Sequence, residues 1–171
     1  FFKVWNQLLV ETYYELYGDE IKRWEGFKLL AVDGSNISVV NVPEVVSHFG
    51  TADNQFGSVP MGRGIQIHDV LNDITIWGDI FPRSYGESSI LANNIERLPE
   101  DSLTLLDRGY PSYNLIYRFN NEEAPRHFLM RCKTTFSNEI KKFVASKTKD
   151  KVITIYPSED SIIRLRQQGY V

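Results

Sequence analysis

Two aspartates that follow short apolar runs are the residues best placed to do chemistry. Asp33 comes after Leu29-Leu-Ala-Val, Asp107 comes after Leu103-Thr-Leu-Leu, and each has a glycine within the next two positions. A short apolar run predicts a buried strand, and the glycine lets the backbone turn sharply. Ligands of open α/β sheets bind beyond the carboxyl ends of the strands. We therefore expect both carboxylates to face one cleft.

Two carboxylates that lie close together repel each other unless a cation sits between them. Hard oxygen ligands of this kind suit Mg²⁺ or Mn²⁺, which keep some of their water molecules for exchange with substrate. A metal site at Asp33 and Asp107 is one interpretation. The alternative, that each aspartate only caps a turn, stays open for either residue taken alone, because a strand followed by Asp and Gly is common.

Other motifs accompany the two aspartates in a fixed order. They are Val32-Asp33-Gly-Ser-Asn-Ile-Ser, Gly64-Ile-Gln-Ile-His-Asp-Val-Leu, Gly86-Glu-Ser-Ser, Leu105-Leu-Asp107-Arg-Gly-Tyr110 and Phe128-Leu-Met-Arg131. Together these motifs resemble the DDE transposases of bacterial insertion sequences. The resemblance covers residues 20–135, and Asp-Arg-Gly-Tyr after an apolar strand is its most specific part.

The resemblance implies an RNase H-like fold, that is, a mixed α/β sheet with flanking helices. It implies a transposase that cleaves DNA strands and transfers them at transposon ends, with two Mg²⁺ or Mn²⁺ held by three carboxylates. Asp33 and Asp107 would be the first two of these metal-binding, catalytic residues, and Ser35 and Arg108 would flank them. The implied partners are DNA at the transposon ends and target, and a second copy of the protein in a homodimeric synaptic complex.

The third carboxylate of the family lies in the pattern Tyr-x2-Arg-x3-Glu-x6-Lys, and no tyrosine of this sequence begins it. Relatives with a β-rich insertion carry that glutamate far downstream. We therefore expect an RNase H-like core over 1–135, the start of an inserted β-subdomain over 136–171, and a catalytic glutamate outside the chain. On its own, a chain of this kind would be inactive.

The remaining elements are expected from apolar periodicity and turn residues. An amphipathic helix over 1–17 should pack its apolar residues on the strands downstream of it. The expected strands are 27–33, 36–42, 64–71, 74–81, 103–107 and 127–133; the expected helices are 86–98, 111–121 and 137–145; and 151–157 with 161–166 should form a hairpin.

Charge is unevenly distributed along the sequence. Residues 1–125 hold 9 Lys and Arg against 18 Asp and Glu, net −9, whereas residues 126–171 hold 10 against 4, net +6. An acidic part could gather metal ligands, and a basic tail could contact phosphates. The DNA-binding candidates are Arg108, Lys141, Lys142 and Lys147, although a plain solvated helix face explains the lysines equally well.

Several classes are disfavoured. No apolar run approaches the roughly 20 residues of a membrane span. The single Cys132 excludes an internal disulfide, so a reducing cytoplasm is expected. The resemblance further implies a bacterial protein associated with the nucleoid. Haloacid-dehalogenase-like phosphatases need a second Asp two positions from the first, where this sequence has Ala31 and Ser35. A decayed or domesticated transposase relative, kept for DNA binding without catalysis, stays open, and the retention of both aspartates counts against it.

Overall fold

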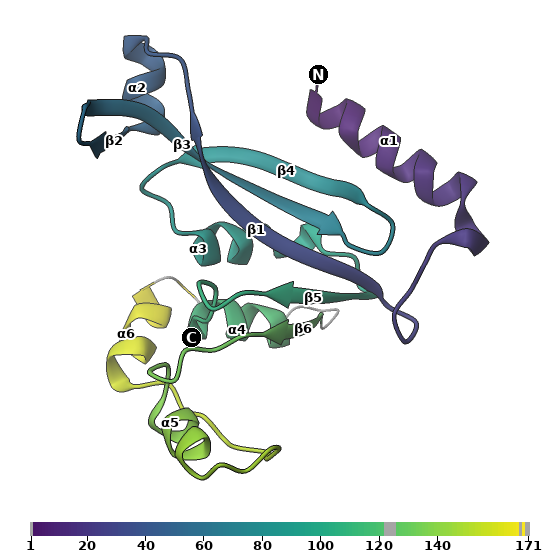
Figure 1. Ribbon diagram of the computed structural model, residues 1–171, viewed down its shortest axis with the longest axis vertical. Helices are drawn as coiled ribbons and strands as arrows, with labels where there is room; N and C mark the ends of the chain where they lie inside the picture. Colours follow the sequence, from purple (N-terminus) through teal and green to yellow (C-terminus); the bar gives the residue numbers. More distant parts are fainter. Residues whose placement is uncertain (1, 122–125, 168, 170–171) are drawn as a thin grey trace.

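A mixed sheet organises the computed structural model, which describes residues 2–121, 126–167 and 169 (Figure 1). The central strand β1 (Lys28–Ser38) pairs antiparallel with β3 (Gly57–Asp69), and β3 pairs antiparallel with β4 (Ile74–Pro82). The other edge of β1 pairs in parallel with β5 (Ser102–Leu106), which pairs in parallel with β6 (His127–Met130). The short β2 (Thr51–Asn54) extends the sheet beside the start of β3.

Helices connect and flank these strands. They are α1 (Phe2–Leu16), α2 (Pro43–Phe49), α3 (Glu87–Ala92), α4 (Tyr113–Asn121), α5 (Asn138–Ala145) and α6 (Glu159–Gln167). Within the described residues, no helix is both long enough and apolar enough to pass through a membrane.

The core lies against one face of the sheet. Its buried side chains are Leu30 and Val32 of β1, Ile65 and Ile67 of β3, Ile90 and Leu91 of α3, and Leu115 and Phe119 of α4. Because side chains alternate along a strand, the burial of Leu30 and Val32 directs Asp33 to the opposite face. The core thereby fixes the orientation of the first candidate aspartate.

The expected break after Asp33 is wrong. The backbone stays extended through Gly34 to Ser38, so the expected strands 27–33 and 36–42 are replaced by one strand with Asp33 in its middle. The long strand β3 causes this continuity, since it pairs with β1 residue by residue from Asp69 opposite Leu30 to Met61 opposite Ser38.

The helix expected over 1–17 is present as α1, but its apolar residues do not pack as expected. Five of them are exposed: Val4, Trp5, Leu8, Leu9 and Leu16. Polar groups attach the helix instead. The Tyr14 hydroxyl donates to buried Asp69 at 2.8 Å, the Asn6 amide donates to the Ile76 carbonyl at 3.3 Å, and Lys3 forms an ion pair with Asp79.

The hairpin expected near the end of the chain is also wrong. Residues 159–167 form helix α6, and the described part of 136–171 contains α5 and α6 without any strand. Helix α6 begins after Ser158, whose hydroxyl accepts from the Ser161 amide at 3.3 Å, and it buries Leu165. The β-rich structure expected here is therefore not formed by these residues.

Other expected elements are confirmed with changed bounds. Strands β3 and β4 form the expected hairpin around Asn72-Asp73, and β5, β6, α4 and α5 lie within one or a few residues of their expected ranges. The expected helix over 86–98 is shorter and continues as a 3-10 turn over Ile95–Arg97.

Candidate functional site

The parallel pairing of β1 and β5 brings the two aspartates to corresponding positions. Lys28 lies opposite Ser102, and the register runs unbroken to Ala31 opposite Leu105. Asp33 and Asp107 each lie two residues beyond the last pair of that register, Asp33 within β1 and Asp107 directly after the end of β5. The expectation that these two strands are neighbours is confirmed.

Asp107 is held by the turn that comes after it. The Gly109 amide donates to Asp107 Oδ1 at 2.7 Å, and the Tyr110 amide donates to the Asp107 carbonyl at 3.2 Å. A Cβ atom on Gly109 would lie 3.0 Å from that Oδ1, so the close approach favours glycine. Asp107 does cap its turn, but the side chain stays exposed and keeps its second carboxylate oxygen for other contacts.

The side chain of Asp33 has no hydrogen-bond or ion-pair partner among the residues that the structure describes. Its exposed side chain lines a cavity of about 490 Å³ together with Lys3 and Ser35. Arg108 and Gly109, the neighbours of Asp107, line a different cavity of about 510 Å³. The two aspartates are thus aligned on the sheet, but these two cavities do not form the single cleft that was expected.

A third acidic residue, Glu87, reaches the same region from the first position of α3. Its carboxylate packs over Gly34, where an added Cβ would come within 2.7 Å of the Glu87 carboxyl carbon. Its Oε1 accepts from Arg63 Nη1 at 2.5 Å. From the sequence alone, Gly86-Glu-Ser-Ser counted only as part of a resemblance. The usable signal was an acid at a helix start together with a glycine next to Asp33.

Tyr110 is a buried residue that is affected by the charge of all three acidic groups. Its side chain is fully buried, and its hydroxyl has no hydrogen-bond partner in the described part of the chain. Burial raises the pKa of this hydroxyl above its ordinary value, and the negative charges of Glu87, Asp33 and Asp107 raise it further, against a smaller opposing effect of Arg63. All three carboxylates therefore lie within electrostatic reach of one buried phenol.

The carboxylates of Asp33 and Asp107 are the type of ligand that a hard divalent metal ion prefers. Carboxylate oxygens are the ligands that Mg²⁺ and Mn²⁺ prefer, and Mg²⁺ commonly binds through one or two carboxylates and retains several waters. Asp33 and the second oxygen of Asp107 could supply such ligands. In the residues described, no set of three or more His, Cys, Asp or Glu side chains is arranged to hold a metal ion.

The other predicted residues lie apart from the aspartates. Lys141 and Lys142 are on α5, where Lys142 lines a separate cavity of about 310 Å³ with Glu139, and Lys147 comes after the end of that helix. Arg108 is exposed next to Asp107. Of the four DNA-binding candidates, the structure brings only Arg108 to the aspartate pair.

Comparisons with known proteins point to transposases. No family model matches the chain. The sequence is 22% identical over 120 residues to the "Putative transposase InsZ" of Escherichia coli (strain K12), a match that covers 68% of this chain and 40% of the relative. The chain therefore spans less than half of that relative's length.

Two solved structures show a distant likeness. The cryo-EM structure of the piggyBac transposase synaptic complex with hairpin DNA is 10% identical, with 73% of this chain and 27% of that chain covered and a TM-score of 0.42. The Mos1 transposase paired-end complex with left transposon end is 9% identical, with coverages of 96% and 53% and a TM-score of 0.40. Both likenesses are too slight to bear on function.

Proposed function

We propose that this chain is part of a DDE transposase with an RNase H-like catalytic domain, which cleaves and joins DNA strands with Mg²⁺ or Mn²⁺ bound at Asp33 and Asp107. The proposal rests on the place of the two aspartates, each of which lies two residues beyond the last pair of the neighbouring parallel strands β1 and β5. The sequence similarity to a putative transposase supports it, as does the strand order, in which β1 lies between the antiparallel β3 and the parallel β5.

In the proposed reaction, an attacking water or 3′-hydroxyl forms a new bond to phosphorus while the bond to the leaving oxygen breaks. Bound metal ions would activate the attacking oxygen and stabilise the charge on the leaving oxygen. Asp33, within β1, and Asp107, directly after β5, would be the residues that hold these ions. The Gly109 amide fixes one oxygen of Asp107, so that the other is oriented before substrate arrives.

The partners follow from this proposal. The substrate is DNA, at transposon ends and at the target, and two copies of the protein would pair two ends. Neither the homodimer nor the third carboxylate of the two-metal site is tested by these observations, and both stay predictions. Glu87 packs over Gly34 on the face of β1 that carries Leu30 and Val32, opposite to the face of Asp33.

Metal binding tests the proposal directly. Mn²⁺ titration, followed by the electron paramagnetic resonance of the free ion, should show binding to the chain that Asp33→Asn and Asp107→Asn each weaken at least about tenfold, because each removes one charged ligand. Asn keeps the size of the side chain. Asp53→Asn is the matched control, since Asp53 is exposed on β2 and is not part of the pair.

Equal Mn²⁺ affinity in Asp107→Asn and Asp53→Asn would contradict the proposed site. DNA binding without any Mn²⁺ binding to the wild-type chain would favour the alternative, a transposase-derived protein that binds DNA and has lost catalysis.

A further inference from the structure

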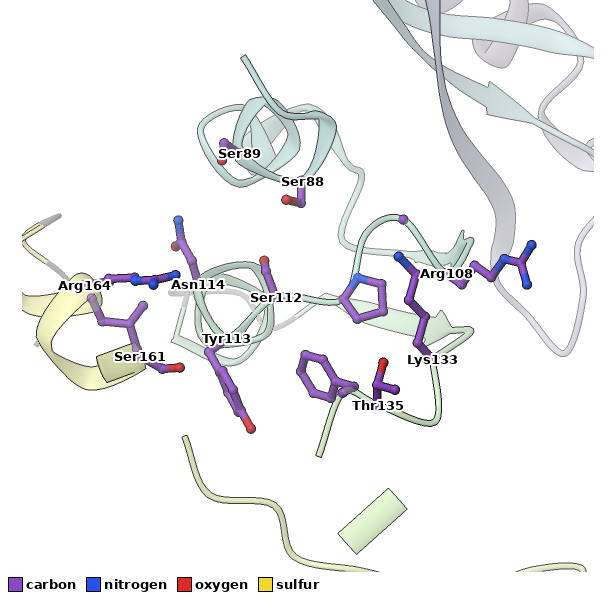
Figure 2. Close-up of a pocket in the computed structure, with 14 residues that line it drawn as sticks. Ser88, Ser89, Arg108, Ser112, Tyr113, Asn114, Lys133, Thr135, Ser161 and Arg164 are labelled. Carbon is purple, nitrogen blue, oxygen red and sulfur yellow. The ribbon is translucent and has the colours of Figure 1, made fainter. Parts of the chain in front are cut away.

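A cavity of about 510 Å³ opens beside the turn that holds Asp107, and it is distinct from the cavity lined by Asp33. Four parts of the chain surround it: the start of α3, the start of α4, the segment after β6, and α6. In Figure 2, Ser88 and Ser89 lie above the opening, Lys133 and Arg108 lie on one side, and Arg164 extends toward Asn114 from the other. The cavity therefore depends on α6, the helix that replaces an expected strand.

The charge of this cavity is entirely positive. Its lining includes Arg108, Lys133 and Arg164 and no aspartate or glutamate. Within the described residues, none of these three side chains has a hydrogen-bond or ion-pair partner. This is a marked local reversal in a chain whose net charge is −3. Unpaired cations around a concave surface raise the local concentration of anions.

Neutral polar groups complete the lining. Ser88, Ser89, Ser112 and Ser161 contribute hydroxyls, and Asn114 Oδ1 is buried without a hydrogen-bond partner in the described part of the chain. Hydroxyl and amide groups commonly contact phosphate oxygens and sugars in protein–DNA complexes. The buried Asn114 Oδ1 needs a hydrogen-bond donor, because such atoms are normally paired. A phosphodiester has no donor, but the N–H group of a nucleobase next to the bound phosphate can supply one.

One side of the cavity is aromatic. The rings of Tyr113 and Phe136 stack with their centroids 5.1 Å apart and their planes at 30°, and both residues line the cavity. The Tyr113 hydroxyl donates to the Tyr156 carbonyl at 3.2 Å, which fixes the ring. Aromatic side chains beside a cationic groove are the usual arrangement for binding single-stranded nucleic acid, because bases stack on rings while phosphates meet cations.

We propose that this cavity binds a phosphate group of a single DNA strand, adjacent to the phosphodiester that meets Asp33 and Asp107. The inference rests on the proposed function for the identity of the strand. Arg108 forms the rim on the side of Asp107 and directs its guanidinium away from Ser112, toward β1 (Figure 2). Arg108 directly follows Asp107 in the chain, so on this side the cavity adjoins the aspartate pair.

The double variant Lys133→Gln/Arg164→Gln tests this binding site. Its affinity for a fluorescently labelled single-stranded oligothymidylate should fall at least tenfold, and the slope of log affinity against log salt concentration should decrease by about 1.4, since each phosphate contact on a single strand contributes about 0.7. Lys133→Glu/Arg164→Glu should weaken binding further. This added loss distinguishes an effect of side-chain charge from an effect of side-chain shape.

Lys22→Gln/Arg97→Gln is the matched control. It removes one lysine and one arginine from exposed positions outside this cavity, so the net charge changes equally. The control should stay within about twofold of the wild type, because distant exposed charges are largely screened. Equal loss in both double variants would show that only net charge matters and would overturn the inference. Circular dichroism and thermal unfolding check that all variants fold.

Inorganic phosphate distinguishes the sources of the anion. If the oligonucleotide occupies the cavity, millimolar phosphate should displace it from the wild type. Phosphate should not displace the oligonucleotide that Lys133→Gln/Arg164→Gln still binds. The variant could instead lose phosphate binding and keep its affinity for the oligonucleotide. That result would mean that the cavity binds a free anion, and it would overturn the inference.

The Mn²⁺ titration separates this inference from the proposed function. Suppose that the cavity variants lose DNA affinity while Asp107→Asn binds Mn²⁺ as well as the wild type does. This pair of results would refute the metal site and support the phosphate site. The reverse pattern would refute the phosphate site alone.

Discussion

Gly34 and Glu87 show how a single missing side chain shapes the region around the aspartates. The Glu87 carboxylate occupies the space where a Cβ atom of residue 34 would be, and in that position it pairs with Arg63 at 2.5 Å. A glycine inside a strand often marks such a close approach rather than a turn. The expected turn after Asp33 was wrong for this reason, since only the folded partner shows what the glycine accommodates.

The substitution Gly34→Ala should displace Glu87 and break its pairing with Arg63. We expect the free energy of unfolding to fall by about 1 kcal/mol, because a partly buried ion pair is lost while the backbone accepts alanine. Urea unfolding measures this loss. In a Glu87→Ala background, Gly34→Ala should lower the free energy of unfolding much less. An equal decrease in both backgrounds would show that the packing of Glu87 does not depend on Gly34.

At the scale of elements, apolar runs predicted the first half of β1, the second half of β3, and β4, β5 and β6, but neither β2 nor the start of β3 over 57–63. The spacing of apolar residues could not decide whether residues 161–166 form a strand or a helix, since a short apolar run suits either. The signal that would have decided it was the helix start, with Ser158 before the acidic pair Glu159 and Asp160. Pairing across the sheet, which puts the two aspartates on neighbouring strands, depends on contacts between distant segments and leaves no local pattern.

Helix α1 depends on polar contacts because its apolar side chains are exposed. Tyr14→Phe removes the hydroxyl that donates to fully buried Asp69 at 2.8 Å. We expect the free energy of unfolding to fall by about 1–3 kcal/mol, the cost of leaving a buried acceptor without one of its donors. Hydrogen exchange should also become faster in the amides of α1.

Tyr17→Phe is the control for this prediction. Tyr17 is exposed at the end of the same helix, so loss of its hydroxyl should change the unfolding free energy by less than about 0.5 kcal/mol. A similar loss in both variants would mean that Asp69 does not anchor α1.

At the scale of the whole molecule, the described residues provide two aligned aspartates and no arranged set of three metal-ligating side chains. We therefore expect residues 1–171 alone neither to nick supercoiled plasmid DNA nor to join strands in Mg²⁺ or Mn²⁺. Each 1.36 kcal/mol of lost transition-state stabilisation is tenfold in rate, and an incompletely held metal site forfeits several such factors.

Gel analysis of plasmid nicking, with and without a chelator, checks this prediction. Metal-dependent nicking by residues 1–171 that Asp107→Asn abolishes would mean that the chain completes its own site. Robust nicking that survives Asp107→Asn would instead place the chemistry elsewhere.

The pairing of β1 also has a kinetic consequence. Its antiparallel partner β3, and β4 which pairs with β3, come soon after it in the sequence, whereas its parallel partner β5 is 74 residues away, as Lys28 opposite Ser102 shows. Contacts between distant residues form slowly, because closing a long loop costs entropy before any contact repays it. The meander of β1, β3 and β4 can therefore assemble early with Asp33 in place, while Asp107 arrives only when β5 docks. The acidic pair is then completed late in folding, and the mutual repulsion of its carboxylates is postponed until most of the core is already formed.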